Sequence, residues 1–572
     1  MDSKELREKF IEFFKNRGHQ SFPASGLVPE NDPSVLFTTA GMQQFKEFYL
    51  HPEAAPAKNM VTCQPCLRTS DIEKVGDDTH LTFFEMLGNF SFGGYFEGSE
   101  KQGSRAQARG SYFKKEAIGY AWEFLTKNLG VDPSRISGII FPGDKKVPRD
   151  DESASILESM AIKYTENQDG TFWGPTGDEG PCGRSVEIYF DDVEIWTLVF
   201  NEFYKTKDQK LNPLKTKGVD TGLGLERMLV VLNNFHDIYE TDLFQPIIHK
   251  VEEETSLKMD KDSEYIKMIA DHLRSSVMIA REGIVPGKNE RESVLRTLIR
   301  RSVQYSSMAG DSHWIEPIVE TIINIFQIQF PDLQGKKENI IQTIFEEGQN
   351  FQKVLSKCEK ILKERKTFSA QDAFFLYQTE GCPLRLYKDY AAQAKILIKD
   401  EDFQQEKAKH QEISRAGVGM FKGGLASGGE KETKYHTATH LLLKALQIVL
   451  GAEVHQRGSN INAERLRFDF SYPDKLTDEQ IRQVEEIVNQ KISENLPVTM
   501  AKMTVEEAKE KGAEAQFTAK YGDKVKVYSI GDFSCEICGG PHVERTGILG
   551  HFKIIKEESS SAGIRRIKAV LK

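Results

Sequence analysis

The sequence has little of what membrane-spanning, secreted or disulfide-stabilised proteins require. No run in its 572 residues approaches 18 consecutive apolar side chains, so we expect no membrane-spanning helix. The first segment, MDSKELREKFIEFFKNRGH, lacks the basic and then apolar order of a signal peptide and is typical of an amphipathic helix. Seven cysteines, an odd number in a long chain, argue against a disulfide framework and favour a reducing compartment. These absences predict a cytoplasmic protein.

An excess of basic residues is also missing, since the formal net charge is −10. A whole-chain electrostatic footprint for nucleic acid is therefore excluded, although local basic patches can still bind phosphates. Two basic segments exist: RTLIRRSVQ, in which Arg296 and Arg300 lie one helical turn apart, and GIRRIKAVLK at the C-terminus. Taken alone, each is equally the pattern of a solvated surface.

The texture of the sequence changes along the chain and predicts a multidomain α+β protein. Residues 1–244 hold short β-like runs such as HLTFFEMLG and VEIYFDD, which predict a largely antiparallel sheet with helices against it. Residues 245–398 show long helical patterns and predict a helical domain. Residues 399–433 are charged and then glycine-rich, which is typical of a linker or an ordered loop. Residues 434–572 alternate helical and β-like runs and predict a compact α+β domain.

Two glycine-rich segments look like nucleotide-binding motifs but fail the test for them. GGLASGGEK has Glu430 where a phosphate loop needs lysine. VDTGLGLERM has Gly222 and Gly224 but no third glycine at G-x-G-x-x-G spacing, so it does not indicate a dinucleotide fold. It does predict a strand that enters a helix with Arg227 at its start, where a guanidinium can contact a purine or a phosphate.

Several consecutive blocks resemble one known family. They are PSVLFTTAGMQQF, CQPCLRTSDIEKVGDDTHLTFFEMLGNFSFGGYF, FWGPTGDEGPCGRSVEIYF, VDTGLGLERM, IADHLRSSVMIAREGIVP, HTATHLL and CGGPHV. In this order they resemble the signature blocks of the alanyl-tRNA synthetases, which are class II aminoacyl-tRNA synthetases, and TFFEMLGNFSFG is nearly diagnostic of them. The resemblance covers essentially the whole chain. It implies a class II antiparallel-sheet catalytic domain, a helical tRNA-recognition domain and an α+β zinc-binding editing domain.

The resemblance implies an ATP site and an amino-acid pocket. Arg68 would bind the α-phosphate, because a guanidinium is always cationic and bidentate. Phe84 would stack on the adenine with Arg227 on its other face, and Asp220 would hold the substrate ammonium. The implied ATP-binding set is Arg68, Phe84, Glu85, Gly224 and Arg227, of which Arg68 and Arg227 are catalytic; the implied amino-acid set is Trp173, Thr197, Asp220 and Gly222.

Mg²⁺ is implied together with ATP, and Glu187 is a further candidate ligand because hard cations on nucleotides prefer carboxylate oxygens. Cys63 and Cys66 form a C-x-x-C pair with no second pair nearby, which favours packing or free thiols over zinc. One residue departs from the family: Thr197 stands where an asparagine is usual, so an amide is lost beside the amino-acid pocket. Asn201 could not replace it from an extended strand without a bend.

The family reads the acceptor stem of its tRNA largely through one G·U pair, and A-form stems are read through the shallow minor groove. The segments that match carry Asn289, Glu290, Arg296, Arg300 and Arg385, which are the expected tRNA-binding residues. Arg385 stands where the family tends to have an acidic side chain. We therefore expect a different mode of reading there.

The physics of binding calls for a second active site. A pocket for alanine cannot exclude glycine by size, because one methylene is worth only about 1–3 kcal/mol, and it cannot strongly reject the added hydroxyl of serine. Hydrolysis of the wrong esters at a separate site would restore accuracy.

The C-terminal part holds residues for that site. His436 and His440 share one helical face, and Cys538 and His542 follow in the matching order, which gives a Cys/His₃ set suited to one Zn²⁺. Thr437 replaces the glutamate of the protease pattern H-E-x-x-H. Cys535 is an alternative ligand. By family analogy, Thr439 and Gln456 would line the pocket that senses the aminoacyl group. The sequence leaves open whether the zinc is hydrolytic or structural.

The expected partners are ATP, alanine and tRNA(Ala). Family members usually continue into a coiled coil and a C-terminal tRNA-binding domain, whereas this sequence ends at Lys572, so we expect a monomer. One alternative is a threonyl-tRNA synthetase, which shares the editing module but lacks TFFEMLGNFSFG. Another is a catalytically inactive tRNA-binding paralogue, which the Thr197 change keeps open.

Overall fold

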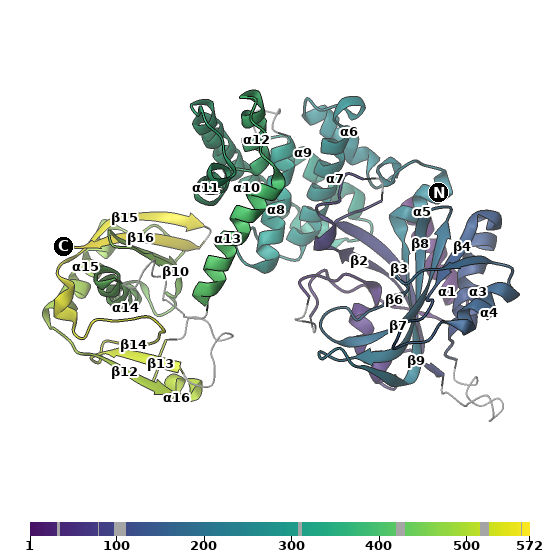
Figure 1. Cartoon of the computed structure of the whole chain (residues 1–572), viewed down its shortest axis with the longest axis horizontal. Helices are drawn as coiled ribbons and strands as arrows, with labels where there is room; N and C mark the ends of the chain where they lie inside the picture. The colour runs from purple at the N-terminus through teal and green to yellow at the C-terminus, as the bar shows by residue number, and fades with distance from the viewer. Residues whose placement is uncertain are drawn as a thin grey trace. The chain divides into compact units, whose positions relative to one another are not determined.

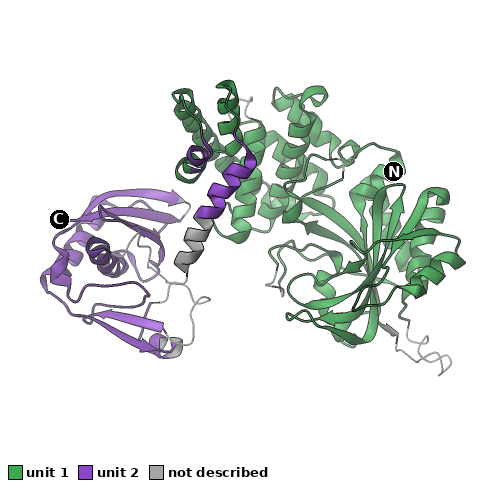
Figure 2. Ribbon diagram, in the orientation of Figure 1, with its two compact units in different colours: residues 1–368, 375–397 green, residues 369–374, 398–572 purple. Residues whose placement is uncertain are grey.

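The computed structural model describes residues 1–30, 32, 35–77, 79–95, 110–306, 312–418, 429–514, 525–561 and 563–572. It divides into two compact units, one of residues 1–368 and 375–397 and the other of residues 369–374 and 398–572 (Figure 2). The predicted boundary between residues 244 and 245 falls inside the first unit. The glycine-rich part of the predicted linker, residues 419–428, lies outside the described residues.

The first unit is built on a nine-stranded sheet (Figure 1). Its order is β1-β2-β3-β9-β8-β7-β4-β5, and β6 pairs with β7 beside this path. All pairs are antiparallel except β1 with β2 and β4 with β5. The predicted largely antiparallel sheet is confirmed. The strands are β1 (Gln20–Ser21), β2 (Asn59–Leu67), β3 (Phe83–Tyr95), β4 (Ile136–Ile140), β5 (Lys163–Glu166), β6 (Phe172–Trp173), β7 (Gly180–Phe190), β8 (Val193–Lys205) and β9 (Leu211–Gly224).

Helix α1 (Ser3–Lys15) packs on one face of this sheet. It begins at Asp2, whose side chain accepts the Glu5 N–H at 2.8 Å. Its apolar face packs on β2 and β3, and Phe10 contacts the ring of Trp196. The other short helices of this region are η1 (Gly41–Phe45), α2 (Lys46–Leu50), η2 (Thr69–Asp71), α3 (Lys114–Glu123), the π-helical η5 (Phe124–Asn128), η6 (Pro133–Arg135), α4 (Asp151–Ser159), α5 (Leu225–Asn233) and η7 (Ile238–Glu240).

A helical region completes the first unit and shares its hydrophobic core with the sheet. Every residue of α7 from Met268 to Ala280 is buried, as in a helix that is packed on all sides. Two of its polar side chains join it to the sheet region: the Asp271 carboxylate accepts the Thr82 N–H at 2.9 Å, and Arg274 pairs with Glu226. The helices are α6 (Gln245–Glu254), α7 (Met259–Arg281), α8 (Glu290–Tyr305), α9 (Ile315–Phe326), α10 (Asp332–Lys363), α11 (Ala370–Glu380) and α12 (Leu384–Gln393).

The second unit contains a helix-and-sheet module with its own core. Its two antiparallel sheets have the strand orders β10-β11-β16-β15 and β12-β13-β14, and α14 packs on α15, β10, β11 and β14. The predicted α+β class is confirmed. The elements are α14 (Glu430–Leu450), β10 (Gln456–Ile461), β11 (Leu466–Ser471), α15 (Asp478–Ser493), β12 (Val498–Met503), α16 (Val505–Glu510), β13 (Val525–Ile530), β14 (Ser534–Ile537), η9 (Thr546–Leu549), β15 (Phe552–Ser561) and β16 (Ile564–Leu571).

The predicted linker differs from a simple loop. Residues 400–418 form the helix α13 (Asp400–Val418). The reason is local: this stretch is rich in Glu, Gln, Lys and Ala and holds no glycine before Gly417, so helix propensity is high. In the described part of the chain, no helix is long and apolar enough to cross a membrane.

A fully buried ion pair between Lys114 and Asp150 offers a test of the packing of the first unit. The Lys114 Nζ and the Asp150 carboxylate are 2.5 Å apart, and both side chains are 0% exposed. Replacing Lys114 by methionine leaves a buried carboxylate whose one remaining cation among the described residues is Arg184, 4.0 Å away. We expect Lys114→Met to lower the stability of the first unit by about 3 kcal/mol.

Urea unfolding followed by tryptophan fluorescence measures this change. The signal reports on the first unit alone, because all four tryptophans lie in it: Trp122, Trp173, Trp196 and Trp314. The matched control is Lys115→Met, which alters the exposed neighbour. Equal unfolding midpoints for the two variants would contradict a role for the buried pair.

Candidate functional site

A pocket opens on the face of the sheet opposite to α1, and we call it the sheet pocket. Successive side chains of a strand point to opposite faces. Phe84 and Met86 of β3 and Asp220 of β9 therefore face the pocket, while Glu85 and Thr221 face the helices. The lining consists of Ala40, Arg68, Asp71, Thr79, His80, Leu81, Phe84, Met86, Trp173, Glu194, Ile195, Thr197, Val199, Asp220, Gly222, Gly224, Glu226 and Arg227.

The structure thus brings together most residues predicted for ATP and the amino acid. The Arg68 guanidinium carbon lies 4.9 Å from the centre of the Phe84 ring, and its Nε donates to the Thr39 carbonyl at 3.3 Å. Arg227 stands on the first turn of α5, three residues after Gly224, which caps that helix with extended backbone. A cation, an aromatic face and a second cation then border one cavity, an arrangement that suits a nucleotide.

Asp220 is the buried anion of the pocket. Its side chain has no hydrogen-bond or ion-pair partner among the residues that the structure describes, and the residue is 4% exposed. Burial raises the pKa of this carboxyl to about 8. A cationic group entering the pocket would supply the missing charge and restore the ionised form.

Gly222 and Trp173 limit the space around Asp220. A side chain at Gly222 would meet the Met86 sulfur at 2.7 Å, so it would have to push the Met86 side chain aside. Trp173 packs on the apolar cluster that contains Met42 and Phe45. The floor of the pocket therefore admits only a small group.

Glu194 also lines the pocket, and sequence reasoning missed it. Its carboxylate accepts the Thr197 hydroxyl at 2.5 Å and lies 3.3 Å from Nη1 of Arg227, which also donates to the Glu194 carbonyl at 3.1 Å. Thr197, the departure from the family, thus serves to anchor Glu194. The signal that could have revealed Glu194 is an acidic residue at the end of a strand that faces the expected arginine.

His80 is a second lining residue that was not predicted. Its Nδ1 lies 2.5 Å from the Asp77 carboxylate, which fixes the ring at the edge of the pocket. The Asp77 carboxyl has a pKa below its usual value; hydrogen bonds from the His80 and Thr79 N–H groups lower it against an opposing effect of burial. The sequence signal would have been a polar residue shortly before Phe84 on the same connection.

Two predicted carboxylates do not join the lining. The Glu85 side chain is buried on the helix face, where it pairs with Arg7 and accepts the Cys63 thiol at 3.3 Å. Strand alternation turns the Glu85 side chain away from Phe84, so it does not face the pocket, and the ATP-binding role of Glu85 stays a prediction. Glu187 lies opposite Thr197 on β7, and burial together with the Glu194 charge raises its pKa to about 7. Cys63 and Cys66 are free, buried thiols.

The predicted tRNA-binding residues lie in the helical region. Asn289 and Glu290 are exposed at the start of α8. Arg300 pairs with Glu347 at 2.6 Å, whereas Arg296 is partly buried near Arg300. The Arg385 guanidinium lies over the stacked rings of Tyr265 and Tyr305, 4.4 and 5.0 Å from their centres. Nothing tests these residues against RNA, so their role stays a prediction.

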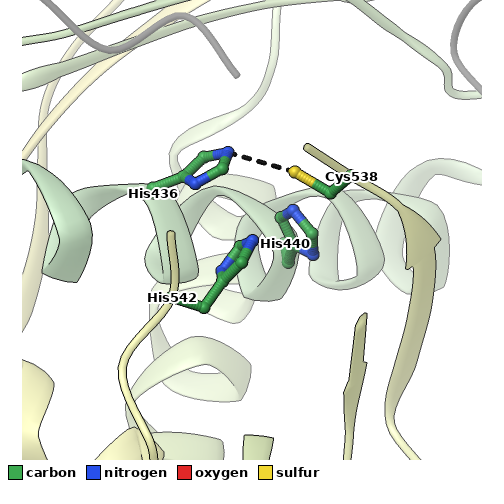
Figure 3. Close-up of side chains that lie close together, drawn as sticks. All are labelled: His436, His440, Cys538 and His542. Carbon is green, nitrogen blue, oxygen red and sulfur yellow. Dashed lines mark hydrogen bonds between the residues drawn. The ribbon is translucent and has the colours of Figure 1, made fainter. Parts of the chain in front are cut away.

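The second unit gathers four ligand-type side chains, three buried and one partly buried (His542), which we call the His/Cys group. His436 and His440 come from α14, and Cys538 and His542 from the segment after β14 (Figure 3). Their ligand atoms all lie within 4.8 Å of one another, and the Cys538 sulfur is 3.4 Å from His436 Nε2. A side chain at Gly540 would meet the His436 ring at 2.3 Å, which explains a glycine in CGGPH.

Each imidazole of the group has a neighbour at its Nδ1. His436 Nδ1 donates to the Pro541 carbonyl at 2.9 Å, and His542 Nδ1 lies 3.2 Å from the Thr437 hydroxyl. His440 Nδ1 is 3.6 Å from the Glu536 carboxylate. Such outer contacts orient imidazoles toward a metal. Thr437, which stands where the protease pattern has glutamate, therefore orients the candidate metal ligand His542.

Burial keeps the group neutral when no cation is present. It lowers the pKa of His436 to about 4 and those of His440 and His542 further below the usual range. It raises the pKa of the Cys538 thiol to about 12. His542 Nε2 is also buried without a hydrogen bond in the described part of the chain. A bound metal ion would satisfy these donors, so the group is able to bind one.

Three further residues were assigned near this group. Cys535 is not part of it, since β14 directs this thiol toward Ser529, whose hydroxyl lies 3.6 Å from the sulfur. The Thr439 hydroxyl is buried on α14 and donates to the His436 carbonyl at 2.7 Å. Gln456 stands on β10, which packs on α14, and its amide lies 3.2 Å from the Ser459 hydroxyl. The roles of Thr439 and Gln456 stay predictions.

Known proteins are similar to this chain across the segments that carry the sheet pocket and the His/Cys group. Residues 5–454 match the family model described as tRNA synthetases class II (A), and residues 525–568 match the threonyl and alanyl tRNA synthetase second additional domain. The alanine–tRNA ligase of Treponema denticola is 43% identical over 99% of this chain and 98% of its own length. That of Borreliella afzelii is 42% identical over 99% of both. That of Petrotoga mobilis is 32% identical over 99% of this chain and 79% of its own length.

The sheet pocket, the His/Cys group and this similarity agree with one another over nearly the whole chain. The protein belongs to the alanyl-tRNA synthetase family of class II aminoacyl-tRNA synthetases.

Proposed function

We propose that this chain activates alanine with ATP, transfers it to tRNA(Ala), and hydrolyses serine and glycine esters of that tRNA at the His/Cys group. The observation that carries the proposal is the Asp220 carboxylate, which is buried, without a partner in the described part of the chain, and in one pocket with Arg68 and Arg227. An α-amino acid and ATP together supply the charges that this pocket lacks.

The amino acid would bind at the floor of the sheet pocket. Its ammonium pairs with Asp220, and the side chain faces Trp173 and Val199. The lack of space beside Gly222 and Met86 favours a methyl group over larger side chains. The carboxylate then points toward Arg68, where the α-phosphate of ATP is expected. This geometry would place the nucleophile and the phosphorus side by side.

ATP would occupy the wider part of the pocket. The adenine stacks on Phe84, and Arg227 covers the other face of the base. Arg68, whose guanidinium lies over the Phe84 ring in the structure, is then displaced toward the phosphates. A guanidinium stabilises the charge that develops on the α-phosphate during attack. Mg²⁺ enters with ATP and neutralises phosphate charge. Glu194 offers a carboxylate in the lining of the pocket, and Glu187, the carboxylate predicted for this role, lies outside the lining beside Glu194.

The acceptor stem would lie on the helical region. Asn289 and Glu290 offer amide and carboxylate groups at the exposed start of α8, and Arg385 is held flat on two tyrosine rings. Placed polar groups of this kind suit the shallow groove of an A-form stem. Arg296 and Arg300 would add contacts to phosphates.

The His/Cys group would hold one Zn²⁺. One thiolate and three imidazoles are borderline ligands that this ion prefers, and when bound it acts as a Lewis acid toward an ester or a water molecule. His436, His440, Cys538 and His542 would hold the ion, while Thr439 and Gln456 would contact the aminoacyl group. The seven free cysteines fit the reducing cytoplasm as the place of action.

An inactive tRNA-binding paralogue is not favoured. Thr197, the change that suggested it, keeps a polar contact to Glu194 in the pocket, and the predicted Arg68, Arg227 and Asp220 all line it. A threonyl-tRNA synthetase is likewise not favoured, since the relatives that match over the whole length are alanine–tRNA ligases.

The first test removes the charge of Asp220. Alanine-dependent exchange of pyrophosphate into ATP should occur with the unaltered chain. Asp220→Asn should raise the KM for alanine by roughly 100-fold or more, since the buried ammonium loses its counter-charge. The KM for ATP should stay within about twofold of the original value, because Asp220 contacts only the amino acid in the proposed pose.

A thermal melt separates loss of binding from loss of structure. Because burial raises the pKa of Asp220 above its unfolded value, the folded state loses stability as the pH rises toward 8. Asp220→Asn removes that loss, so its melting temperature at pH 8 should equal or exceed that of the original chain. No exchange with any amino acid in the original chain would refute the proposed synthesis.

The second test removes two ligands of the His/Cys group. The double variant Cys538→Ala and His542→Ala should lose the bound zinc, about one per chain before the change, because two of four donors are gone. Hydrolysis of Ser-tRNA(Ala) should fall to the background rate, while alanine activation stays unchanged, since the sheet pocket lies in the other unit. Metal analysis and a deacylation assay measure the two effects.

Cys535→Ala is the matched control, because this thiol is three residues from Cys538 and outside the group. It should retain zinc and hydrolysis. If the double variant still hydrolysed Ser-tRNA(Ala), the group would not be the editing site.

A further inference from the structure

A chain of four side chains joined by hydrogen bonds runs through the interior of the first unit, from the end of α1 to the strand that carries Asp220. His19 Nε2 lies 3.0 Å from the Tyr112 hydroxyl, and the Asn89 amide donates to that hydroxyl at 2.6 Å. The Thr221 hydroxyl in turn donates to Asn89 Oδ1 at 2.6 Å. All four side chains are buried: His19, Tyr112, Asn89 and Thr221.

The direction of every proton in this chain is determined. His19 Nδ1 faces the Phe14 carbonyl at 3.1 Å, and a carbonyl only accepts, so the proton is on Nδ1 and Nε2 accepts. Tyr112 must therefore donate to His19, and its oxygen accepts from the Asn89 Nδ2. Asn89 then presents Oδ1 to the Thr221 hydroxyl. Burial lowers the pKa of His19 to about 4 and keeps the ring in this neutral form.

The chain of hydrogen bonds ends inside the sheet. The Thr221 hydroxyl also accepts the backbone N–H of Asn89 at 3.2 Å, so this side chain bridges β3 and β9. The register around it pairs Leu87 with Leu223 and Phe90 with Asp220. Thr221 therefore fixes the separation of the two strands at the residue directly after Asp220.

Asp220 depends on its backbone for its position. Among the described residues its carboxylate has no hydrogen-bond or ion-pair partner that would hold it in one place. Its neighbours Thr221 and Gly222 are the fixed points: the first through the hydrogen bonds to Asn89, the second through its close approach to Met86. The ammonium site is thus rigid only as far as β9 is rigid.

We propose that His19, Tyr112, Asn89 and Thr221 are positioning residues for the amino acid, and that their hydrogen-bonded chain holds β9 so that Asp220 faces the substrate ammonium. This inference rests on the proposed function, in which alanine binds at Asp220. None of the four side chains lines the sheet pocket, so they act through Asp220 and not by contact with a substrate.

The chain of hydrogen bonds should affect the binding of the amino acid and leave the binding of ATP unchanged. Phe84 stands at the start of β3, five residues before Asn89, Arg68 directly follows β2, and Arg227 is held by Glu194. A loosened β9 therefore changes the alanine site first. A general loss of structure would weaken the binding of both substrates alike.

The test measures pyrophosphate exchange for variants of Thr221 and Tyr112. Thr221→Val keeps the shape and removes the hydroxyl, and it should raise the KM for alanine about 10-fold, with the KM for ATP within about twofold. Thr221→Ser restores the hydroxyl and should return the KM for alanine to within about threefold of the original. Tyr112→Phe, a milder change, should raise the KM for alanine in the same direction by about threefold.

Tyr120→Phe is the matched control. Its ring lies 5.3 Å from that of Tyr112, and it removes a half-buried hydroxyl that is outside the chain of hydrogen bonds. This variant should leave both KM values unchanged.

A double variant tests whether the four residues act as one unit. If they do, Thr221→Val combined with Tyr112→Phe should raise the KM for alanine no more than Thr221→Val alone. Equal changes in the KM for alanine and for ATP, or an effect of Thr221→Val that Thr221→Ser does not reverse, would overturn the proposal. Absence of exchange in the original chain would instead refute the proposed function itself.

Discussion

The first unit depends on charged and polar side chains that are buried in its interior and therefore must be paired. The helix α7 is enclosed on all sides, yet it carries Asp271 and Arg274. Asp271 accepts the Thr82 N–H, and Arg274 pairs with Glu226, which lines the sheet pocket. Removing either Arg274 or Glu226 while the packing persists would leave the other charge buried and unpaired, which is costly. The helical region and the sheet therefore form one body, although their sequences look like separate domains.

The cost of burying an unpaired charge also matters at the two sites, but there the side chains are left available for a ligand. Where structural charges are paired, two groups proposed for substrates lack an ion-pair partner in the described part of the chain: Asp220 in the sheet pocket, and Arg68, which rests on the Phe84 ring with one carbonyl contact. Such groups are costly to bury when alone, and a ligand of the right charge removes the cost. Rigid neighbouring segments keep such a charge available for a ligand, because a charged side chain that could move would pair with another group of the protein.

The His/Cys group follows this logic in the second unit. Three imidazoles are each approached at Nδ1 by a carbonyl, a hydroxyl or a carboxylate, while four ligand atoms converge within 4.8 Å. Helix α14 supplies two of the ligands at i and i+4 spacing, so the helix alone sets half of the geometry. The other half comes from a loop whose Gly540 allows close contact with His436.

Local patterns in the sequence determined the element types, the pairing of His436 with His440 on one helix, and the residues that match the family blocks. Those depend on near neighbours in the chain. Only the tertiary structure decided which strand face each residue joins: it turned Glu85 away from the pocket, brought Glu194 into it, and linked His19 to Thr221 across 202 positions. The two-residue period of a strand makes its side chains alternate between the two faces of the sheet, but it does not decide which face is covered by other segments. That choice depends on contacts between segments far apart in the sequence.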